Sequence, residues 1–339
     1  MRVLILFGGM SAEHEVSLVS ADFVDNVLRG AGHETVCVRI DRDGSWRLDE
    51  EPLEIHAGHP VWELASGSGR ILFDVVFPVL HGPFGEDGTV QGLCMMAGWP
   101  FTGAGVMTSS LAMNKIASKE LAEARGLPVL PWRSFGSGRP PDPDSIGELG
   151  WPVFVKPARM GSSVGISRVD GPEGLEEAAE LALRYDSLIL VEKGLEGARE
   201  IEVALLSEGG EVSSSIPGEV VPGLEWYDYR AKYSCAESRL LIPAPIPASL
   251  SDRFRRCAER SFSMMAGAGF ARSDFLLGPG EEFYFNEINT IPGFTEISMF
   301  PKLWKATGVT PEALMERILK EAVNRHGEIS RNSLEVTGR

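Results

Sequence analysis

The first residues of the chain constrain its fold more than any other segment. The apolar run 3–7 predicts a buried strand, Gly8 and Gly9 interrupt it, and a helical pattern follows with Ser11 as its expected N-cap. A strand, a glycine loop and a helix form the unit from which parallel α/β domains are built. Further strands predicted at 36–40 and 73–80 extend this domain over roughly the first hundred residues.

Length and charge set further bounds. A chain of 339 residues is long enough for two or three domains, each with its own core. The formal net charge of -16 opposes attraction to nucleic acid or to an anionic membrane. A phosphate-bearing ligand must then be held by a local cluster of cations and backbone N–H groups. We therefore expect small-molecule partners, with no nucleic acid and no membrane.

We expect no targeting segment in this sequence. Its apolar start is too short for a signal peptide, and no stretch approaches the roughly 18 apolar residues of a membrane span. The cysteines are too widely spaced for a CxxC motif and are expected to be reduced thiols: Cys37, Cys94, Cys235 and Cys257. These features predict a cytoplasmic protein.

The middle of the chain predicts a second, smaller α/β lobe. A helical pattern covers 110–125, and a loop rich in Gly, Pro and Asp covers 136–145. Apolar strands are expected at 153–155 and 188–191.

Strands resume from about residue 200. A strand is predicted at 201–206, and a hairpin at 270–277 and 282–288 is joined by the turn 278–281. A terminal helix is expected over 311–324.

A lysine inside an apolar strand, followed by a loop of small residues, is the first chemical signal. Lys156 precedes Gly161-Ser-Ser-Val-Gly165, whose N–H groups can wrap phosphates. The loop also matches the G-x-S-x-G pattern of serine hydrolases, but a strand rather than a helix is expected after it. A Walker A loop is excluded because no Gly-Lys pair occurs in the sequence. A surface hairpin with a solvated lysine is the remaining alternative.

The predicted C-terminal hairpin carries the second signal. If its four-residue turn sets a simple register, one face gathers Arg272, Asp274, Glu287 and Asn289. Two carboxylates and an amide suit Mg²⁺ bound to a substrate phosphate, and the arginine can neutralise a phosphoryl group in transfer. A solvated strand face is the alternative.

Two glycine-containing loops add weaker signals. The turn at Pro292 and Gly293 offers an exposed backbone N–H that could form an oxyanion hole. His81 opens the glycine-rich loop 81–88 at the carboxyl end of a predicted strand. Both patterns are also common as turns without a chemical function.

Five segments, in this order along the chain, resemble the signatures of the D-alanine–D-alanine ligase family of the ATP-grasp superfamily. They are Gly8-Gly-Met-Ser-Ala-Glu-His-Glu-Val-Ser, His81-Gly-Pro-Phe-Gly-Glu-Asp-Gly, Lys156-Pro-Ala-Arg-Met-Gly-Ser-Ser-Val-Gly, Tyr227-Asp-Tyr-Arg-Ala-Lys-Tyr and Asn286-Glu-Ile-Asn-Thr-Ile-Pro-Gly-Phe-Thr. The match extends from Gly8 to about Gly308 and is very specific.

The resemblance implies an N-terminal parallel α/β domain, pre-ATP-grasp and Rossmann-like, followed by a two-lobed ATP-grasp fold. The expected units are a substrate-binding domain at 1–108, a central lobe at 109–199 and a C-terminal lobe at 200–330 that carries the metal and substrate site. ATP is expected between the two lobes. The resemblance also implies a homodimer.

The cofactors implied by the resemblance are ATP and two Mg²⁺ ions, for which Mn²⁺ can substitute. Lys115 and Lys156 would hold the phosphates beside the 161–165 loop, with Ser162 and Ser163 in it. The residues expected at the adenine and ribose are Glu192, Lys193, Leu195 and Glu200, the last of them one residue further along than is usual in the family. The expected metal ligands are Asp274, Glu287 and Asn289.

The reaction implied is the ligation of two D-alanines through an acyl phosphate. Glu15 would bind the ammonium of the first, supported by Ser162 and Tyr233, and Arg272 with the Gly293 N–H would stabilise the oxyanion. The substrate-binding residues expected besides Glu15 are His81, Lys232, Tyr233, Ser298 and Met299. The Ala-Lys-Tyr sequence that ends at Tyr233 favours the dipeptide over products made with D-lactate or D-serine.

Two other classes stay open at this point. An ATP-grasp ligase that joins other carboxylates and amines would share the nucleotide residues but not those for D-alanine. A catalytically silent ATP-binding module would bind nucleotide without turnover.

Overall fold

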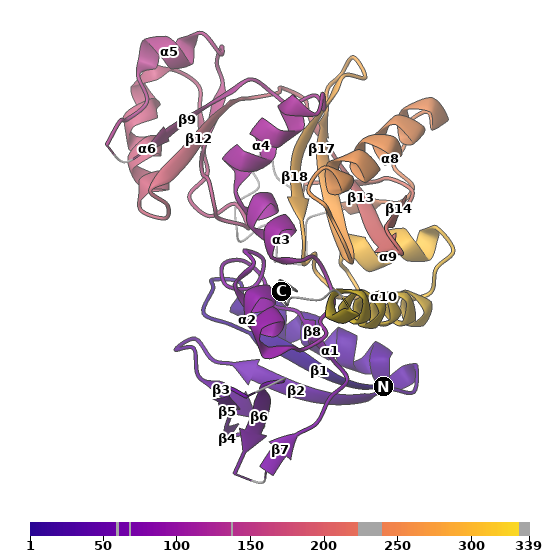
Figure 1. Cartoon of the computed structure of the whole chain (residues 1–339). Coiled ribbons are helices and arrows are strands. Elements are labelled where there is room, and N and C mark those ends of the chain that lie inside the picture. The colour runs from indigo at the N-terminus through magenta and orange to yellow at the C-terminus, as the bar shows by residue number, and fades with distance from the viewer. Residues whose placement is uncertain (59–60, 68, 137, 223–238, 332–339) are drawn as a thin grey trace, which may run out of the picture.

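The computed structural model describes residues 1–58, 61–67, 69–136, 138–222 and 239–331. Within these ranges the chain forms a mixed α/β fold. Its N-terminal sheet lies at one end of the molecule, and two further sheets stand beyond it with helix α4 (Lys115–Ala124) between them (Figure 1).

The N-terminal sheet has the strand order β4-β3-β2-β1-β8. Its strands are β1 (Arg2–Gly8), β2 (Glu34–Ile40), β3 (Trp46–Leu48), β4 (Glu51–Pro52) and β8 (Val75–Pro78). β1 pairs in parallel with β2 and β8, which confirms the three predicted strands and their parallel arrangement. The antiparallel edge, β3 and β4, was not predicted because such short strands show no alternation of apolar residues. A small antiparallel sheet lies nearby, formed by β5 (Glu54–His56), β6 (Glu63–Ser66) and β7 (Gly69–Ile71).

The first helix, α1 (His14–Gly30), begins later than the sequence predicts. Ser11 is not its N-cap. The Ser11 hydroxyl instead accepts a hydrogen bond from the Glu13 N–H at 3.1 Å and donates one to the His81 carbonyl oxygen at 2.6 Å. Ser11 therefore ties the turn before α1 to the loop after β8.

The helix predicted at 110–125 is two helices, α3 (Val106–Met113) and α4, which follow α2 (Thr89–Ala97). The chain is extended at Asn114, whose side-chain oxygen accepts the N–H groups of Ile116 and Ala117 at 3.1 and 3.2 Å. Asn114 is therefore the N-cap that starts α4 in a new direction.

The central sheet is antiparallel, in the order β11-β10-β12-β9. Its elements are β9 (Trp132–Gly136), α5 (Pro143–Gly147), β10 (Val153–Pro157), β11 (Ser167–Val169), a 3-10 turn (Pro172–Gly174), α6 (Leu175–Leu183) and β12 (Leu188–Lys193). The apolar face of α6 packs against β10 and β12, and the two predicted strands are confirmed.

The C-terminal sheet has the order β16-β15-β13-β17-β18, with β14 also paired to β13. Its elements are β13 (Arg199–Glu208), β14 (Glu211–Ser214), β15 (Gly218–Val221), β16 (Arg239–Leu241), α8 (Ala248–Ser263), β17 (Phe270–Leu277) and β18 (Phe283–Asn289). One face of the sheet buries a core against α8.

The predicted hairpin is confirmed, but its simple register is wrong. Leu277 pairs with Phe283, and the register then shifts, because Phe275 pairs with Phe285 while Asp274 pairs with Glu287. Asn286 is the extra residue of this β-bulge. The turn covers 278–282, one residue more than predicted, and the bulge adds one further residue to β18. The two shifts together restore the original alternation, so that the four predicted polar residues still share one face.

The chain ends in α9 (Met299–Ala306) and α10 (Pro311–Arg331), and α10 crosses over the N-terminal sheet (Figure 1). The predicted terminal helix is therefore confirmed and longer than expected. One hydrophobic core joins β1, β8 and α1 to β13, α9 and α10. Among the described residues, no helix combines the length and apolarity needed to cross a membrane.

Candidate functional site

A cavity of about 1160 Å³ lies where the loops after β1 and β8 face the loop after β10 and the hairpin β17–β18. The predicted site residues that line it are Glu15, His81, Ser162, Glu200, Arg272, Asp274, Glu287, Asn289, Gly293, Ser298 and Met299. Residues far apart in the sequence are therefore brought to one space. Lys232 and Tyr233 lie outside the described residues.

The hairpin face holds an arginine against carboxylates. Arg272 donates from Nε and Nη2 to the two carboxylate oxygens of Asp274, each at 2.7 Å, and its Nε lies 3.0 Å from Glu202. Burial alone would lower the pKa of Arg272, but Asp274 and Glu202 outweigh it and raise that pKa well above its usual value. The guanidinium is therefore permanently charged and fixed in direction. Asn289 directs its side-chain oxygen to the N–H of Ile291 at 3.1 Å.

Lys115 connects α4 to this face and to the glycine loop. Its ammonium donates to the Met160 carbonyl oxygen at 2.7 Å and lies 3.3 Å from Glu287. A lysine that touches both the loop and a predicted metal ligand is well placed for a phosphate that lies between them.

Lys156 belongs to a second charged group, whose members are not part of the cavity lining. Its ammonium donates to Glu192 on the neighbouring strand at 2.7 Å, and Glu192 also forms an ion pair with Lys119 of α4. Burial would raise the pKa of Glu192, but the two lysines lower it to about 2. Glu192 is thus ionised although its side chain is only 2% exposed.

The loop after β10 has an uncommon backbone conformation and is not followed by the helix of a nucleophile elbow. Ser162 and Ser163 have φ of +51° and +58°, and Gly165 has +70°. Left-handed serines are uncommon and cluster at functional sites. The next regular element is the strand β11 and not a helix, as predicted, so that the serine-hydrolase alternative is not supported.

Glu13, for which the sequence made no prediction, is buried in the cavity wall, whereas the predicted Glu15 lies at its exposed margin. Glu15 has a side chain 71% exposed and is bonded to Arg42 at 3.0 Å, at the margin of the cavity. Glu13 is buried, lines the cavity and accepts the hydroxyl of Ser162. A Cβ on Gly161 would lie 3.1 Å from a Glu13 carboxylate oxygen, so the glycine allows this close approach.

Two further ionisable groups are buried beside Glu13. His81 is bonded through Nδ1 to the Ile291 carbonyl oxygen and through Nε2 to the Ser20 hydroxyl, both at 3.0 Å. Burial lowers the pKa of His81. Burial, reinforced by Glu13, raises the pKa of Glu86 to about 8, although the Gly82 N–H donates to it at 2.6 Å. At neutral pH both side chains are uncharged.

The loop after β18 is braced by its own side chains. The Ser298 hydroxyl accepts the Thr295 N–H at 3.1 Å, and a Cβ on Gly293 would lie 2.8 Å from that hydroxyl. Gly293 therefore allows Ser298 to sit directly beneath the turn. Met299, predicted to contact the substrate, starts α9. Its side chain belongs mainly to the hydrophobic core and also contributes to the cavity lining.

The predicted adenine residues lie at the carboxyl end of β12 and in the connection that follows it. Glu192 is buried in the ion pairs described above, Lys193 is exposed at the end of β12, and Leu195 follows in the connection to β13. Glu200 lines the cavity from β13. The predicted nucleotide-binding residues that do not line that cavity are Lys115, Lys156, Ser163, Glu192, Lys193 and Leu195.

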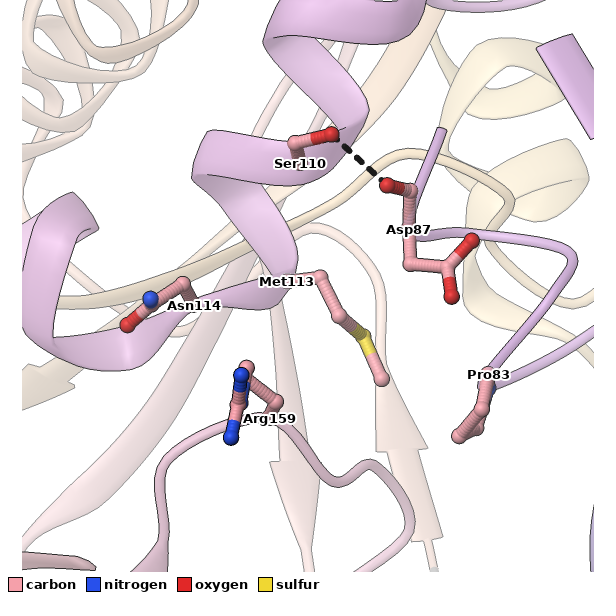
Figure 2. A pocket seen from close by; sticks show the side chains of 6 residues that line it. All are labelled: Pro83, Asp87, Ser110, Met113, Asn114 and Arg159. Atoms are coloured by element: carbon pink, nitrogen blue, oxygen red, sulfur yellow. Dashed lines mark hydrogen bonds between the residues drawn. The ribbon is translucent and has the colours of Figure 1, made fainter. Parts of the chain in front are cut away.

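A second cavity, of about 290 Å³, lies beside the point where α3 ends and α4 begins (Figure 2). Its lining is Pro83, Asp87, Ser110, Met113, Asn114 and Arg159. Its polar groups already hold the fold together. Ser110 donates to the Asp87 carbonyl oxygen at 2.7 Å, and Arg159 makes a two-point ion pair with Asp186. None of the predicted site residues lies in its lining.

The residues present fit hard cations bound together with phosphate. Within the described ranges, no three His, Cys, Asp or Glu side chains form a closed metal site. Asp274 and Glu287 are instead paired directly across the hairpin, with Asn289 next along β18, and each carboxylate is close to a cation, Arg272 or Lys115. One or two carboxylates plus substrate oxygens is the arrangement that Mg²⁺ commonly uses.

Sequence reasoning missed Glu13, Glu86, Glu202 and Lys119. Glu13 and Glu86 lie inside segments that were recognised, but their burial has no signature in a single sequence. Lys119 lies four residues after Lys115, so both share one face of α4, which is the only signal that could have pointed to it.

Comparison with known proteins matches both parts of the chain. Residues 2–104 match the family described as D-ala D-ala ligase N-terminus, and residues 121–320 match D-ala D-ala ligase C-terminus. The chain is 41% identical to the D-alanine–D-alanine ligase of Enterococcus faecalis over 96% of this chain and 99% of that protein. The corresponding protein of Heliobacterium modesticaldum is 42% identical over 98% and 97%.

Solved structures agree. The D-alanine–D-alanine ligase from Coxiella burnetii superposes with a TM-score of 0.88 at 31% identity, covering 98% of this chain and 96% of that one. The VanG D-Ala:D-Ser ligase from Enterococcus faecalis superposes with a TM-score of 0.84 at 30% identity, covering 95% and 99%.

Proposed function

Because the chain belongs to the D-alanine–D-alanine ligase family, we propose that it joins two D-alanines into D-alanyl-D-alanine at the expense of ATP, for peptidoglycan synthesis. The observation that carries the proposal is the large cavity. One wall holds the buried Glu13 with its partner Ser162, which suits an ammonium group. Another wall holds Arg272, Asp274 and Glu287, which suit phosphate and its metal.

The nucleotide would lie between the central and C-terminal sheets. Lys115 and Lys156 are the cations for its phosphates, and the 161–165 loop supplies N–H groups above them. The adenine is assigned to the segment with Glu192, Lys193 and Leu195, and the ribose to Glu200. The left-handed serines at 162 and 163 support this assignment, since such uncommon backbone conformations cluster at ligand-binding sites.

Asp274, Glu287 and Asn289 would hold the Mg²⁺ ions. Bound there, Mg²⁺ neutralises phosphate charge. The pairing of Arg272 with Asp274 and of Lys115 with Glu287 supports the assignment, because these carboxylates already lie beside positive charge. When phosphate arrives, both cations are within reach of it.

In the reaction that we propose, a carboxylate oxygen of the first D-alanine attacks the γ-phosphorus of ATP, which gives an acyl phosphate and ADP. The amine of the second D-alanine then attacks the acyl carbon, loses a proton and displaces phosphate. Arg272 and the Gly293 N–H stabilise the oxyanion of this second step. Their place on the cavity wall supports this role.

The substrate ammonium of the first step is assigned to Glu13 in place of Glu15. Glu13 is buried and already bonded to Ser162, whereas Glu15 points to solvent and to Arg42. Lys232 and Ser298 are assigned to the carboxylate of the second D-alanine, and Tyr233 to its selection. His81 and Met299 complete the wall of the substrate site.

We further assign the three units 1–108, 109–199 and 200–330 as domains, and a cytoplasmic homodimer as the working form. The three larger sheets, one in each unit, support the division, and the small sheet of β5, β6 and β7 falls within the first unit.

The proposal is tested by phosphate release from ATP and Mg²⁺ with D-alanine, L-alanine, D-alanine plus D-lactate, D-alanine plus D-serine, and no amino acid. Release that requires D-alanine, with D-alanyl-D-alanine as the product, is the expected result. A D-serine arm is included because one structural relative is a D-Ala:D-Ser ligase. Nucleotide binding with no stimulation by D-alanine would overturn the substrate assignment and favour a silent module or another ligase.

A further inference from the structure

Lys119 is the most deeply buried ammonium group in the described part of the chain that the proposed reaction does not use. Its side chain is 1% exposed, and it lies on the face of α4 that also carries Lys115. A lysine is rarely buried to this degree unless it is paired. A charge buried this deeply needs a structural or functional reason.

The partner of Lys119 is Glu192, which it shares with Lys156. One carboxylate oxygen of Glu192 pairs with Lys119, and the other accepts from Lys156 at 2.7 Å. The side chain of Lys156 is 12% exposed, so of the two lysines it is the one open toward the proposed nucleotide. Glu192 is thus a buried anion between a fixed cation and an accessible one.

We infer that Lys119 is a positioning residue for the nucleotide site, which holds Glu192 so that Lys156 is free to turn to the phosphates of ATP. A carboxylate buried in protein strongly retains a lone counter-ion, because the unpaired charge is costly. With Lys119 present, Glu192 keeps a partner when Lys156 leaves it. Without Lys119, the same carboxylate competes with the phosphates for Lys156.

The position of α4 explains how one helix can perform this task. α4 lies between the central sheet and the C-terminal sheet (Figure 1). Lys115 reaches Glu287 of β18, and Lys119, one turn later, reaches Glu192 of β12. From a single face, the helix therefore places one lysine beside a carboxylate of each sheet.

The test measures nucleotide affinity directly, by calorimetry with a non-hydrolysable ATP analogue and Mg²⁺, without D-alanine. Lys119→Met keeps the length and removes the charge, and we expect it to weaken binding about tenfold or more. The double variant Lys119→Met/Glu192→Gln removes the competing carboxylate as well, and we expect it to regain most of that loss. Glu192→Gln alone gives the reference for any direct contact of Glu192 with the nucleotide.

Ser118→Ala is the matched control, because Ser118 is equally buried on the same helix and its hydroxyl makes no hydrogen bond to a described residue. It should leave affinity unchanged. In steady-state assays Lys119→Met should raise KM for ATP while KM for D-alanine stays within about twofold. A purely structural role would instead lower the melting temperature, shift both KM values together and give no recovery in the double variant, and this result would overturn the inference.

The inference rests on the proposed nucleotide site but not on the amino-acid substrate. If D-alanine stimulates no turnover, the proposed ligation fails while the calorimetric comparison still decides the role of Lys119. If the analogue binds to Lys119→Met as tightly as to the natural protein, the proposed role of Lys119 fails while the proposed ligation can stand.

Discussion

At the scale of single residues, two glutamates two positions apart differ in their surroundings. Glu13 is buried against Ser162, and Glu15 is solvent-exposed beside Arg42. Glu13→Gln removes a buried charge that a substrate ammonium would pair with, and we expect KM for D-alanine to rise about tenfold to a hundredfold. Glu15→Gln should change it less than threefold, since exposed ion pairs contribute little. Steady-state kinetics at saturating ATP compare the two, and the opposite order would return the ammonium to Glu15.

Arg272 offers a second test at this scale, because its guanidinium is locked toward Asp274 and the cavity. Arg272→Ala should lower turnover roughly 100- to 1000-fold, as loss of one oxyanion donor typically does. Arg199→Ala is the control, since Arg199 lies on the neighbouring strand and pairs with Glu219 at 2.6 Å outside the cavity lining. A loss below tenfold for Arg272→Ala, measured as phosphate release, would contradict its catalytic role.

At the scale of elements, the direction of α4 depends on its cap. Asn114 accepts two backbone N–H groups, so Asn114→Ala should lower the free energy of unfolding by about 1 kcal/mol. Asn114→Asp retains an acceptor beside the positive end of the helix and should be at least as stable as the natural protein. Urea unfolding followed by circular dichroism measures both. Equal destabilisation by the two changes would show that the cap bond is not what stabilises this helix.

The same elements show how far sequence patterns reach. Apolar runs predicted β1, β2, β8, β10, β12 and the hairpin, because burial in a sheet imposes them directly. The polar face of the hairpin was predicted correctly, but its register was not. The bulge at Asn286 cannot be recognised from the alternation of polar and apolar residues along the strand. The break before Lys115 was missed because helical residues flank it on both sides. Glu13 and Lys119 were missed because a single sequence does not show which charges become buried.

At the scale of the whole molecule, the fold keeps a proton that the unfolded chain would release. Burial and Glu13 raise the pKa of Glu86 from 4.5 to about 8. Between these values the unfolded chain has lost the proton and the folded chain holds it, so this group makes stability fall as pH rises through that window. Glu86→Gln is neutral throughout, and its melting temperature relative to the natural protein should therefore be higher at pH 8 than at pH 5. Glu120→Gln is the control, because Glu120 is exposed, and it should show no such difference between the two pH values. The same melting-temperature difference for Glu86→Gln at pH 5 and pH 8 would contradict the raised pKa of Glu86.

The shared core of the two ends of the chain has a consequence for biosynthesis. Val3 and Ile5 of β1 pack in one cluster with Leu314 and Ile318 of α10. β1 leaves the ribosome well before α10, so the face of the N-terminal sheet that α10 covers stays open until α10 has been made. The N-terminal sheet is therefore completed only after the C-terminal sheet, and during that interval its apolar strands are the surface that a chaperone on the nascent chain would meet.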